Sequence, residues 1–407
     1  MTQPEKSSGP SLGEQVALVA LLISIVALSI DAMLPALNII GEDLHVAEPN
    51  DAQFVISLFF LGLAFGQMIY GPVSDSTGRK PAIYVGLLIF VAGTILSIIS
   101  TGFTMMLVGR FLQGLGAAGP RIVVIALIRD LYEGRAMARI MSMIMAVFII
   151  VPAIAPAIGQ GIMMFAGWRM IFWSFLAIGL FAFFWFMFRQ PETLAEENRA
   201  RFSARRIWRG VVETCTNRTA FGYTIVAGLI YGAFVGYLLS AQAVFQNQYG
   251  VGEIFPLYFA VLALAIGISS IVNSKLVLKH GMRPLSRLAI ICLCVLSIPF
   301  FAVAWAFAGD PPLWMLMAYF CLAFLMIGVL FGNFNALAME PLGHIAGVAA
   351  AVIASLTTFI SLAIGGSIGL AFSGTILPLV GGFALLGVAS LIVMEWTERG
   401  PQTAPAE

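Results

Sequence analysis

The sequence has few charged residues, few cysteines and few histidines. Charged side chains make up 10% of its 407 residues, whereas an ordinary globular domain carries roughly a quarter. Lys and Arg (21) nearly balance Asp and Glu (20), so no global field exists to attract nucleic acid. The four cysteines have no CxxC spacing and are expected to be small packing residues. Three scattered histidines cannot build a metal site.

What the sequence has in abundance is apolar length. Apolar residues make up 60% of the chain, and at about 20 residues per membrane span they suffice for roughly twelve spans. This amount excludes a single-anchor protein, a soluble Rossmann enzyme and a secreted disulfide scaffold, and the continuous runs exclude an outer-membrane barrel. The spans are predicted at 15–40, 53–73, 82–101, 103–128, 140–164, 168–188, 219–245, 254–274, 286–307, 313–337, 345–370 and 375–395.

The basic residues predict the orientation of these spans. With an even number of spans, both termini lie on one side of the membrane. If that side is the cytoplasm, all 21 basic residues except Arg110, Arg121 and Arg169 lie there or at its surface, as the positive-inside rule requires. The first apolar segment lacks a small-residue cleavage site, so we interpret it as a retained span and not as a signal peptide.

One segment, 189–218, departs from this apolar composition and separates six predicted spans from six. It mixes arginines and glutamates with apolar residues such as Trp208, and we interpret it as a cytoplasmic linker lying partly on the membrane surface. The predicted domains are therefore an N-terminal six-helix bundle, 1–188, and a C-terminal six-helix bundle, 219–407. An internal repeat supports the division, because a Gly-x-x-Pro turn follows both the second span (78–81) and the eighth (281–284).

Residues 71–81 resemble the G-x-x-x-D-x-x-G-R-[RK] loop of the major facilitator superfamily. Gly71 lets the adjoining helices approach closely, and Gly78 permits a turn that other residues resist. Asp75 can receive the N-terminal amides of a neighbouring helix or pair with a basic group. Such a polar loop can latch the cytoplasmic ends of two helices in one conformation and release them in another; the alternative is a plain turn with a capping Asp. The predicted conformational loop consists of Gly71, Asp75, Gly78, Arg79 and Lys80.

The fourth span contains Arg110-Phe-Leu-Gln113-Gly, which resembles the R-x-x-Q-G motif of proton-coupled members of the superfamily. Arg110 and Gln113 are three residues apart and share a helix face. An arginine in a span usually faces a partner or a wet cavity, although Arg110 could instead reach the outer membrane interface.

Residues 152–161 of the fifth span resemble the antiporter motif G-x-x-x-G-P-x-x-G-G. Pro156 and Gly159 match it, and Pro152 adds a second break in the helix, while three expected glycines are replaced, by Val151, Ala155 and Gln160. A kinked helix with a small-residue face could act as a pivot and seal between the halves. An ordinary proline-kinked span is the alternative.

Two further segments resemble the bicyclomycin and chloramphenicol resistance subfamily. Residues 28–37 are similar to its S-x-D-M-Y-L-P-A-L pattern, with Ala32 and Met33 in place of the usual Met and Tyr, and residues 335–349 are similar to its loop between the tenth and eleventh spans. The resemblance implies an all-α integral membrane fold of twelve helices in two pseudo-symmetric bundles, located in the bacterial inner membrane.

Asp31 is the only acid well within a predicted span. Burying an ionised carboxylate costs several kcal/mol or more, so such a group takes a proton or finds a partner. Leaving water raises the pKa of a carboxyl group and a nearby arginine lowers it, so a site that alternates between these surroundings binds a proton on one side and releases it on the other. We hypothesise that Asp31 carries the proton, with Arg110 as its electrostatic modulator and Gln113 as a hydrogen-bonding neighbour. Alternatively, Asp31 caps the outer end of the first helix and never titrates.

Arg121 lies eleven residues after Arg110, three helical turns further on roughly the same face. It could hold an anionic substrate, influence the ionisation of Asp31, or pair with a polar group in another span. Two cavity arginines opposing one acid would favour neutral or anionic molecules over cationic drugs. The other candidates for a drug-binding cavity are Tyr231, Phe234, Gln242 and Phe245 of the seventh span and Asn333 and Asn335 of the tenth. Such aromatics can equally pack against lipid or helices, and Asn often forms an interhelical bond.

The sequence thus predicts a secondary active multidrug exporter that exchanges an amphipathic molecule for protons. An importer or a dedicated metabolite exporter on the same scaffold is the alternative within transport, and a receptor would need a signalling domain besides these spans. No Ser-His-Asp arrangement, HExxH or nucleotide-binding loop suggests an enzyme or an ATP-driven pump. We expect a monomer in lipid that uses the proton gradient and needs no cofactor, metal or nucleic acid.

Overall fold

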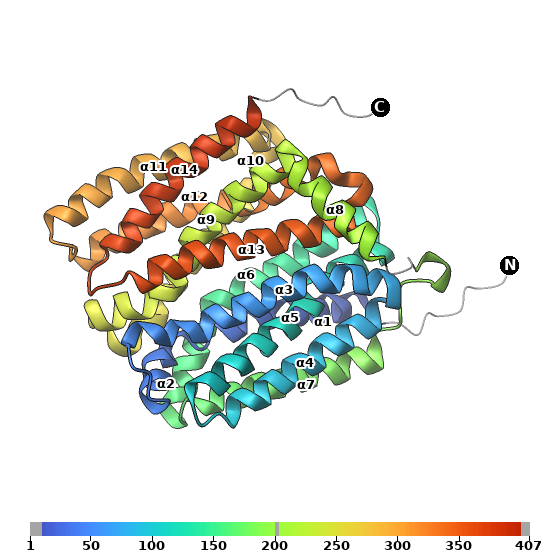
Figure 1. Cartoon of the computed structure of the whole chain (residues 1–407), viewed down its shortest axis with the longest axis horizontal. Coiled ribbons are helices and arrows are strands. Elements are labelled where there is room, and N and C mark those ends of the chain that lie inside the picture. The colour runs from blue at the N-terminus through green and yellow to red at the C-terminus, as the bar shows by residue number, and fades with distance from the viewer. Residues whose placement is uncertain (1–9, 200–202, 400–407) are drawn as a thin grey trace.

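The computed structural model describes residues 10–199 and 203–399, and no β-strand occurs in these two ranges. Long helices run side by side through the molecule (Figure 1). They are α1 (Leu12–Asp31), α2 (Leu37–Asp43), α3 (Phe54–Thr77), α4 (Arg79–Ile98), α5 (Phe103–Leu131), α6 (Gly134–Phe165), α7 (Arg169–Arg189), α8 (Ala204–Thr216), α9 (Arg218–Gln242), α10 (Phe255–His280), α11 (Met282–Ala306), α12 (Leu313–Met339), α13 (Ala346–Leu370) and α14 (Leu377–Glu398). Two basic residues, Lys6 and Arg201, lie outside the described residues. The same is true of residues 1–9 of the first predicted domain and 400–407 of the second.

Short helical turns connect several of these helices. The 3-10 turns are η1 (Leu34–Ala36), η2 (Pro49–Gln53), η3 (Glu196–Asn198), η5 (Gly252–Ile254) and η6 (Glu340–Ile345), and a π-helical segment, η4 (Ala243–Gln248), continues α9. The candidate span Leu12–Asp43 contains the predicted span 15–40, and within it the α-helix is interrupted between α1 and α2. Proline lacks a backbone N–H and disfavours helical geometry in the residue before it, so Pro35 ends α1 early and leaves Asp31 as its last residue.

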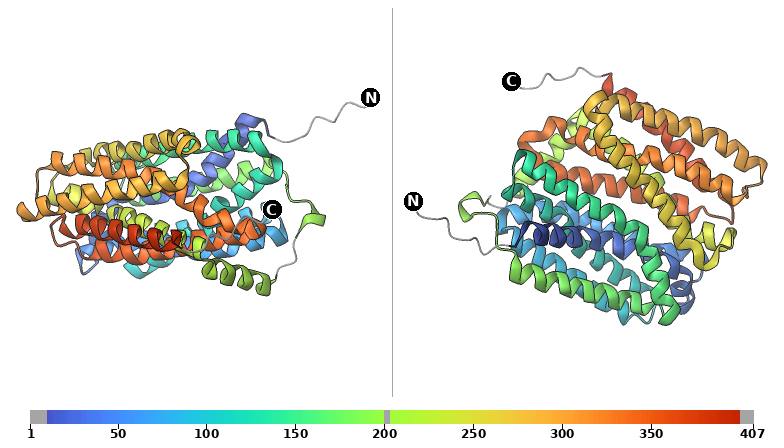
Figure 2. Two further views of the ribbon diagram at one scale, coloured as in Figure 1. Left: turned by 90° about the horizontal axis from the view of Figure 1, so that it is seen from above. Right: turned by 180° about the vertical axis from the view of Figure 1, so that it is seen from behind.

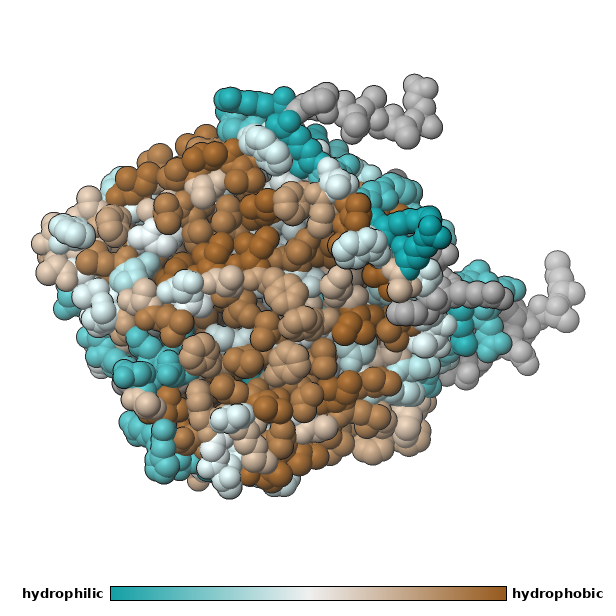
Figure 3. Space-filling view, in the orientation of Figure 1, coloured by the Kyte–Doolittle hydropathy of each residue, from teal (hydrophilic) through white to brown (hydrophobic). Residues whose placement is uncertain are grey.

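Eleven segments of the described chain are long and apolar enough to cross a membrane. Ten coincide with one predicted span each, which confirms the prediction of an all-α, multi-span membrane protein. The remaining segment, Leu313–Leu370, covers two predicted spans in 58 residues. It consists of α12 and α13 joined by η6, where Leu342 leaves helical geometry (φ −112°, ψ 22°). Apolar side chains cover the flank of the molecule, and hydrophilic ones gather toward the ends of the helices (Figure 3).

Glycines let α3 and α5 pack with their backbones almost in contact. A Cβ atom on Gly62 would lie 2.0 Å from the carbonyl oxygen of Phe111, and one on Gly114 would lie 1.9 Å from that of Phe59. Neither position could carry a larger residue without moving a helix. This small-residue packing is how membrane helices associate closely where no hydrophobic effect drives them together.

Helices α1–α7 pack among themselves, as do α9–α14, and the two groups meet where α3 lies on α13 and α6 lies on α10. Hydrogen bonds join the two groups in and beside the α3–α13 seam: Asn50 Nδ2 in η2 donates to the carbonyl of Phe372 just after α13 at 2.7 Å, and Ser355 Oγ donates to that of Ala64 at 2.8 Å. At the far end of the seam, Gly71 approaches Ala351, with only 3.2 Å left between its Cβ position and the alanine methyl. The two groups are therefore in contact from one end of this seam to the other.

Helix α8 lies apart from these long helices, along the outside of the bundle (Figure 2, left). It packs against the start of α13, where a Cβ on Gly210 would lie 2.5 Å from Val348, and Glu213 Oε1 contacts His344 Nε2 at 2.6 Å. Helix α1 begins and α14 ends at this same end of the molecule (Figure 1).

Candidate functional site

A cavity of about 210 Å³ lies between the two groups of helices. Helices α1, α3, α5 and α6 line it from one group, and α9, α10 and α12 from the other. Most of the lining is aliphatic or aromatic, and its charged side chains are Asp31 and Arg121. This is the composition of a site for a small amphipathic ligand, an apolar wall with a few polar groups to orient the ligand.

Asp31 reaches this cavity from the end of α1 and is 5% exposed. Within the described part of the chain, its carboxylate makes no hydrogen bond and no ion pair. Sequence reasoning located the residue, but the helix break that places it at a helix terminus came from the structure. A carboxylate at a helix C-terminus also faces the negative end of the helix dipole, which makes its ionised form harder to accommodate.

The helix that resembles the antiporter motif touches α1 directly beside Asp31. A Cβ on Gly159 would lie 1.7 Å from the carbonyl oxygen of Ala32, so α6 crosses α1 at backbone contact there. Pro152 lines the cavity one turn from Pro156, and both prolines lie inside α6. Movement of α6 would therefore act on the backbone that carries Asp31.

Arg110 is fully buried and holds α1, α3 and α5 together. Its Nε donates to the carbonyl of Val55 at 2.8 Å and its Nη2 to that of Ser29 at 2.9 Å, while Nη1 donates to Gln113 Oε1. The guanidinium stacks on the ring of Phe59, 4.6 Å from its centroid. Its side chain is thus enclosed by protein and does not reach the surface of the molecule.

Gln113 completes this arrangement, because its Nε2 donates to Thr94 Oγ1 at 2.8 Å and so extends the contact to α4. No ion pair joins Arg110 to Asp31 in residues 10–199. Arg110 instead holds the α1 backbone at Ser29, two residues before Asp31. Any influence of Arg110 on the carboxylate must act through that stretch of helix or through space.

Of the predicted cavity residues, Arg121, Tyr231 and Phe234 line the cavity. Tyr231 lies within electrostatic reach of both Arg121 and Asp31. Arg110 is absent from the lining, so the expectation of two cavity arginines opposing one acid is wrong. The cavity lining contains one arginine, Arg121, and one acid, Asp31.

The structure does not bring the other four predicted residues into the cavity lining. Gln242 Nε2 donates to Gln246 Oε1 at 2.9 Å, and Phe245 packs against the rings of Phe255 and Tyr258 in α10. Asn333 accepts from Asn273 at 2.9 Å and donates to Ser286 at 3.2 Å, which is the interhelical role considered as the alternative. Asn335 is exposed and donates to the carbonyl of Phe331.

Sequence reasoning missed several apolar residues of the lining, most of them aromatic. Tyr237 and Leu238 continue the face that Tyr231 and Phe234 begin, so extending that stripe by helical spacing would have found them. Phe259, Phe324 and Phe331, from α10 and α12, complete the wall. No sequence signal distinguishes these three from lipid-facing phenylalanines.

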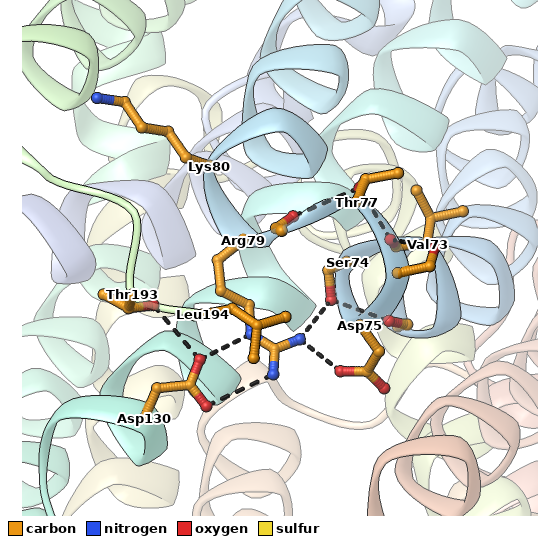
Figure 4. A network of polar contacts seen from close by, with 12 residues as sticks. Val73, Ser74, Asp75, Thr77, Arg79, Lys80, Asp130, Thr193 and Leu194 are labelled. Atoms are coloured by element: carbon orange, nitrogen blue, oxygen red, sulfur yellow. Dashed lines mark hydrogen bonds and ion pairs between the residues drawn. The ribbon is translucent and has the colours of Figure 1, made fainter. Parts of the chain in front are cut away.

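A second polar site lies at the end of the bundle near α8, and we call it the inner network: Ser74, Asp75, Arg79, Asp130 and Glu192. Figure 4 shows Arg79 at its centre. Its Nη1 donates to Asp75 Oδ1 and, at 3.0 Å, to Ser74 Oγ, and its Nε donates to Asp130 Oδ2 at 2.8 Å. Although it carries a charge, Arg79 is only 4% exposed. It therefore ties the end of α3 to the end of α5.

Asp75 also faces the other group of helices. Its Oδ2 lies 3.3 Å from where a Cβ on Gly347 would be, in the first turn of α13. A carboxylate is stabilised by the positive end of the helix dipole at such a position. With the close approach of Gly71 to Ala351, this puts the predicted conformational loop at the junction of the two groups.

Glu192 closes the inner network from the segment after α7, and sequence reasoning missed it. Its Oε1 accepts from the backbone N–H groups of Arg79, Thr193 and Leu194, and its Oε2 accepts from that of Lys80, all at 2.9–3.0 Å. The carboxylate thus caps the start of α4, directly after Gly78 (φ 107°). Burial raises the pKa of Glu192, but the four N–H donors outweigh burial and hold the pKa below its ordinary value.

Asp130 and Lys80 extend these contacts to neighbouring segments. Asp130 also accepts from Thr193 Oγ1 at 3.3 Å, and Lys80 Nζ donates to the carbonyl of Met187 at 3.1 Å. The first bond ties the beginning of the predicted linker to α5, and the second ties α4 to the end of α7. The part of the linker before residue 195 is therefore an anchored segment of the N-terminal half.

Comparison with known proteins places this architecture in a family. Residues 19–366 match the Major Facilitator Superfamily. The chain belongs to the major facilitator superfamily. The human organic anion transporter MFSD10 (TETRAN) has a similar fold, with a TM-score of 0.67 and 14% sequence identity over 95% of this chain and 100% of that one.

Two bacterial members of the superfamily are similar over most of their length. The bicyclomycin resistance protein homolog of Haemophilus influenzae is 30% identical over 80% of this chain and 81% of its own. YdgK of Bacillus subtilis, an MFS-type transporter, is 28% identical over 85% of this chain and 87% of its own. The multidrug resistance protein MdtL of Shigella dysenteriae is 25% identical over 62% of this chain. These relatives confirm the resemblance to the drug-resistance branch of the superfamily.

The acidic, histidine and cysteine side chains of the described residues are dispersed. Among the residues that the structure describes, no three His, Cys, Asp or Glu side chains gather into a group that could hold a metal ion. The cavity offers one carboxylate and one guanidinium, and neither chelates a metal alone.

Proposed function

We propose that this protein is a secondary active exporter that exchanges an amphipathic small molecule for protons by alternating access. The observation that supports this most is the unpartnered carboxylate of Asp31 in a cavity bounded by both halves of the chain. Burying an ionised carboxylate without a partner is costly. A proton or a positively polarised ligand relieves that cost equally well, so the two compete for one site.

We infer twelve membrane spans in two bundles of six. The 58-residue segment Leu313–Leu370 would measure about 87 Å as one helix at 1.5 Å per residue, nearly three times the thickness of the hydrocarbon core. It therefore has to cross twice and turn at η6. The bundles are α1–α7 and α9–α14, joined by the linker with α8.

We place both termini, the inner network and α8 on the cytoplasmic side of the bacterial inner membrane. The exposed arginines of α8 and Lys275, Lys279 and Arg283 after the eighth span lie at that end, as the positive-inside rule predicts. The relatives from Haemophilus, Bacillus and Shigella make a bacterial membrane the natural setting.

The transport cycle follows from the contacts at the seam. Contact along the whole of α3 and α13 keeps the cavity from opening fully at either end. Opening toward the cytoplasm requires Asp75 to leave the first turn of α13 and Gly71 to part from Ala351. Opening outward requires the loss of contacts such as that of Asn50 with Phe372. Asp31 would then meet each aqueous phase in turn and exchange its proton there.

Coupling between the seam and Asp31 would run through α6 and α1. Gly159 rests on the carbonyl of Ala32, and Arg110 holds the carbonyl of Ser29, so the residues on both sides of Asp31 are fixed to other helices. A shift of α6 against α1 changes the surroundings of the carboxylate without any new contact to it. We assign Arg110 and Gln113 the role of holding α1 while α6 moves.

Transport in everted membrane vesicles tests this proposal. Vesicles with the protein should accumulate amphipathic fluorescent dyes when a respiratory substrate acidifies the lumen, and an uncoupler should abolish the accumulation. Vesicles without the protein provide the control. Accumulation that survives the uncoupler but needs ATP would contradict a proton-driven exchanger. Proton-driven uptake restricted to one metabolite would replace the drug with a dedicated substrate.

A further inference from the structure

The two charged side chains of the cavity carry opposite signs and are not paired with each other. Asp31 comes from the end of α1 and Arg121 from the middle of α5, and no ion pair within 4.0 Å joins them in the described residues. The hydroxyl of Tyr231 lies within hydrogen-bonding reach of Arg121 and within electrostatic reach of Asp31. The cavity therefore presents a negative and a positive pole, both supplied by the N-terminal half.

The opposite wall of the cavity is aromatic and comes from the C-terminal half. Tyr237 packs edge-on against Phe324 at a centroid distance of 4.8 Å, and Tyr231 against Phe331 at 5.3 Å. Phe234 connects these pairs, 5.8 Å from Phe324. Rings held by one another in this way form a rigid surface on which a flat apolar ligand can stack at little cost in side-chain entropy.

One polar atom of this aromatic wall lacks a partner. Tyr237 is 1% exposed, and its hydroxyl makes no hydrogen bond with the residues that the structure describes. Buried hydroxyls in native proteins are almost always bonded, because an unmade bond costs about 1–3 kcal/mol. Asp31 lies within electrostatic reach of this hydroxyl. The orphan hydroxyl points to a ligand that supplies the missing bond beside Asp31.

We propose that the preferred substrate is a zwitterion with a flat apolar body, whose cationic group is bound at Asp31 and whose anionic group is bound at Arg121. This inference rests on the proposed function and names the substrate class of its cavity. The apolar body stacks on the aromatic wall, and Tyr237 bonds to the end of the ligand that lies next to Asp31.

The charges of the cavity exclude the simpler ligand classes as best substrates. A plain cation pairs with Asp31 but leaves Arg121 without an ionic partner, and a plain anion pairs with Arg121 but leaves Asp31 to be neutralised by a proton. A neutral molecule leaves both poles unpaired. Only the zwitterion serves both poles, and its cationic end still displaces the proton from Asp31, which preserves the exchange.

Three xanthene dyes with nearly the same ring system test this inference. Tetramethylrhodamine free acid is a zwitterion, its methyl ester is a cation, and fluorescein is an anion. Binding to purified full-length protein in detergent is measured at pH 7 by fluorescence polarisation. The zwitterion should bind about tenfold or more tightly than either of the others, the difference expected for one additional well-formed charge contact.

Substitutions then assign each pole. Arg121→Gln should remove the preference for the zwitterion over the ester and leave the affinity for the ester unchanged or higher, which also shows that the variant is folded. Arg121→Lys should keep most of the preference. Arg129→Gln, an exposed arginine two turns further along α5, is the matched control and should behave as the wild type. Tyr237→Phe should weaken binding of the zwitterion several-fold.

The inference is overturned if wild-type protein binds the ester or fluorescein as tightly as the free acid, or if Arg121→Gln keeps the preference. These binding measurements need no proton gradient. If the zwitterion is preferred in binding but vesicles show no proton-driven uptake, the proposed exchange is overturned and the ligand class stands. If vesicles show proton-driven uptake but binding shows no preference for the zwitterion, only the ligand class is overturned.

Discussion

At the scale of single residues, the central feature is a carboxylate held in place entirely by its neighbours. The carboxylate of Asp31 makes no hydrogen bond or ion pair with any described residue, but Arg110 binds the backbone two residues before it and Gly159 touches the backbone one residue after it. Its ionisation can therefore respond to movement of α5 or α6. Two predictions follow from these neighbours.

Replacing Gly159 by alanine should impair transport. The added methyl would lie 1.7 Å from the carbonyl oxygen of Ala32, so α6 and α1 must move apart. Overpacking of this kind costs about 1–3 kcal/mol, and we expect dye uptake in vesicles to fall about tenfold. Gly161→Ala is the matched control, because nothing lies within 4 Å of its Cβ position. Equal uptake by the two variants would show that the contact with Ala32 has no role in the cycle.

Replacing Arg110 by lysine should destabilise the protein although it keeps the charge. The guanidinium serves acceptors on three different helices, Val55, Ser29 and Gln113, and one ammonium group cannot reach all of them. Each lost charge-assisted bond costs about 1.5–3 kcal/mol. Thermal unfolding in detergent should show a clear loss for Arg110→Lys and none for Arg129→Lys. A lysine variant as stable as the wild type would contradict this structural role.

The sequence could predict which residues line the cavity only where a charged side chain stands within an apolar span. Asp31 and Arg121 are charges within apolar spans, and such charges are expensive enough to mark a site. Asn333 and Gln242 are also polar residues in apolar spans, but neither lines the cavity. Asn333 hydrogen-bonds to Asn273 of a neighbouring helix, and Gln242 hydrogen-bonds to Gln246 further along the chain. Which face of a span meets the cavity depends on the neighbouring helices, and periodicity in an almost uniformly apolar helix does not encode it.

At the scale of helices and loops, the inner network shows how segments distant in sequence form one hydrogen-bonded cluster. Arg79 donates hydrogen bonds to Asp75, at the end of α3, and to Asp130, at the end of α5. Glu192 caps the start of α4 although it lies 113 residues after Arg79 in the sequence. The motif predicted the loop because its spacing is local. Glu192 and Asp130 escaped prediction because only the packing of α5 and α7 against α4 brings them there. The early end of α1, in contrast, could have been read from Pro35.

The cap formed by Glu192 predicts a pH-dependent contribution to stability. Since the folded pKa lies below the ordinary value of 4.5, the carboxylate stabilises the fold fully above about pH 4.5, and the contribution is lost as pH falls through the lowered pKa. Glu192→Gln should cost about 1 kcal/mol at pH 7, the typical cost of losing a helix cap. The gap between wild type and variant should narrow below pH 4.5.

Thermal unfolding in detergent from pH 7 down to pH 3.5 measures this gap. Glu197→Gln, an exposed acid of the same linker, should match the wild type throughout. A gap for Glu192→Gln that is absent at pH 7, or that persists unchanged at the lowest pH, would show that the ionised carboxylate does not cap α4.

At the scale of the whole molecule, the two halves divide the work of binding. The N-terminal half supplies both charges of the cavity and most of the inner network, and the C-terminal half supplies the aromatic wall and the helix N-terminus that Asp75 faces. The multi-span helical fold was predictable from hydropathy, since only helices satisfy their own backbone in lipid. The closed seam between α3 and α13 was not, because it depends on which faces of the bundles meet.

A cysteine pair across the seam should arrest the cycle. The Cβ position of Gly71 lies 3.2 Å from that of Ala351, close to the separation found in disulfides. In a background without the four native cysteines, oxidised Gly71→Cys/Ala351→Cys should lose dye transport, and reduction should restore it. Full transport by the oxidised, cross-linked protein would mean that the two halves need not part at this end.

The central claim is that Asp31 exchanges a proton as the cavity changes sides, and Asp31→Asn in proteoliposomes tests it most directly. With an imposed pH gradient, the wild type should drive uphill dye uptake and the asparagine variant should not. Without a gradient, both should still exchange external for internal dye, because the cavity and the seam remain intact. Glu48→Gln, an exposed acid in the loop between α2 and α3, should behave as the wild type. Undiminished proton-driven uptake by Asp31→Asn would contradict the account.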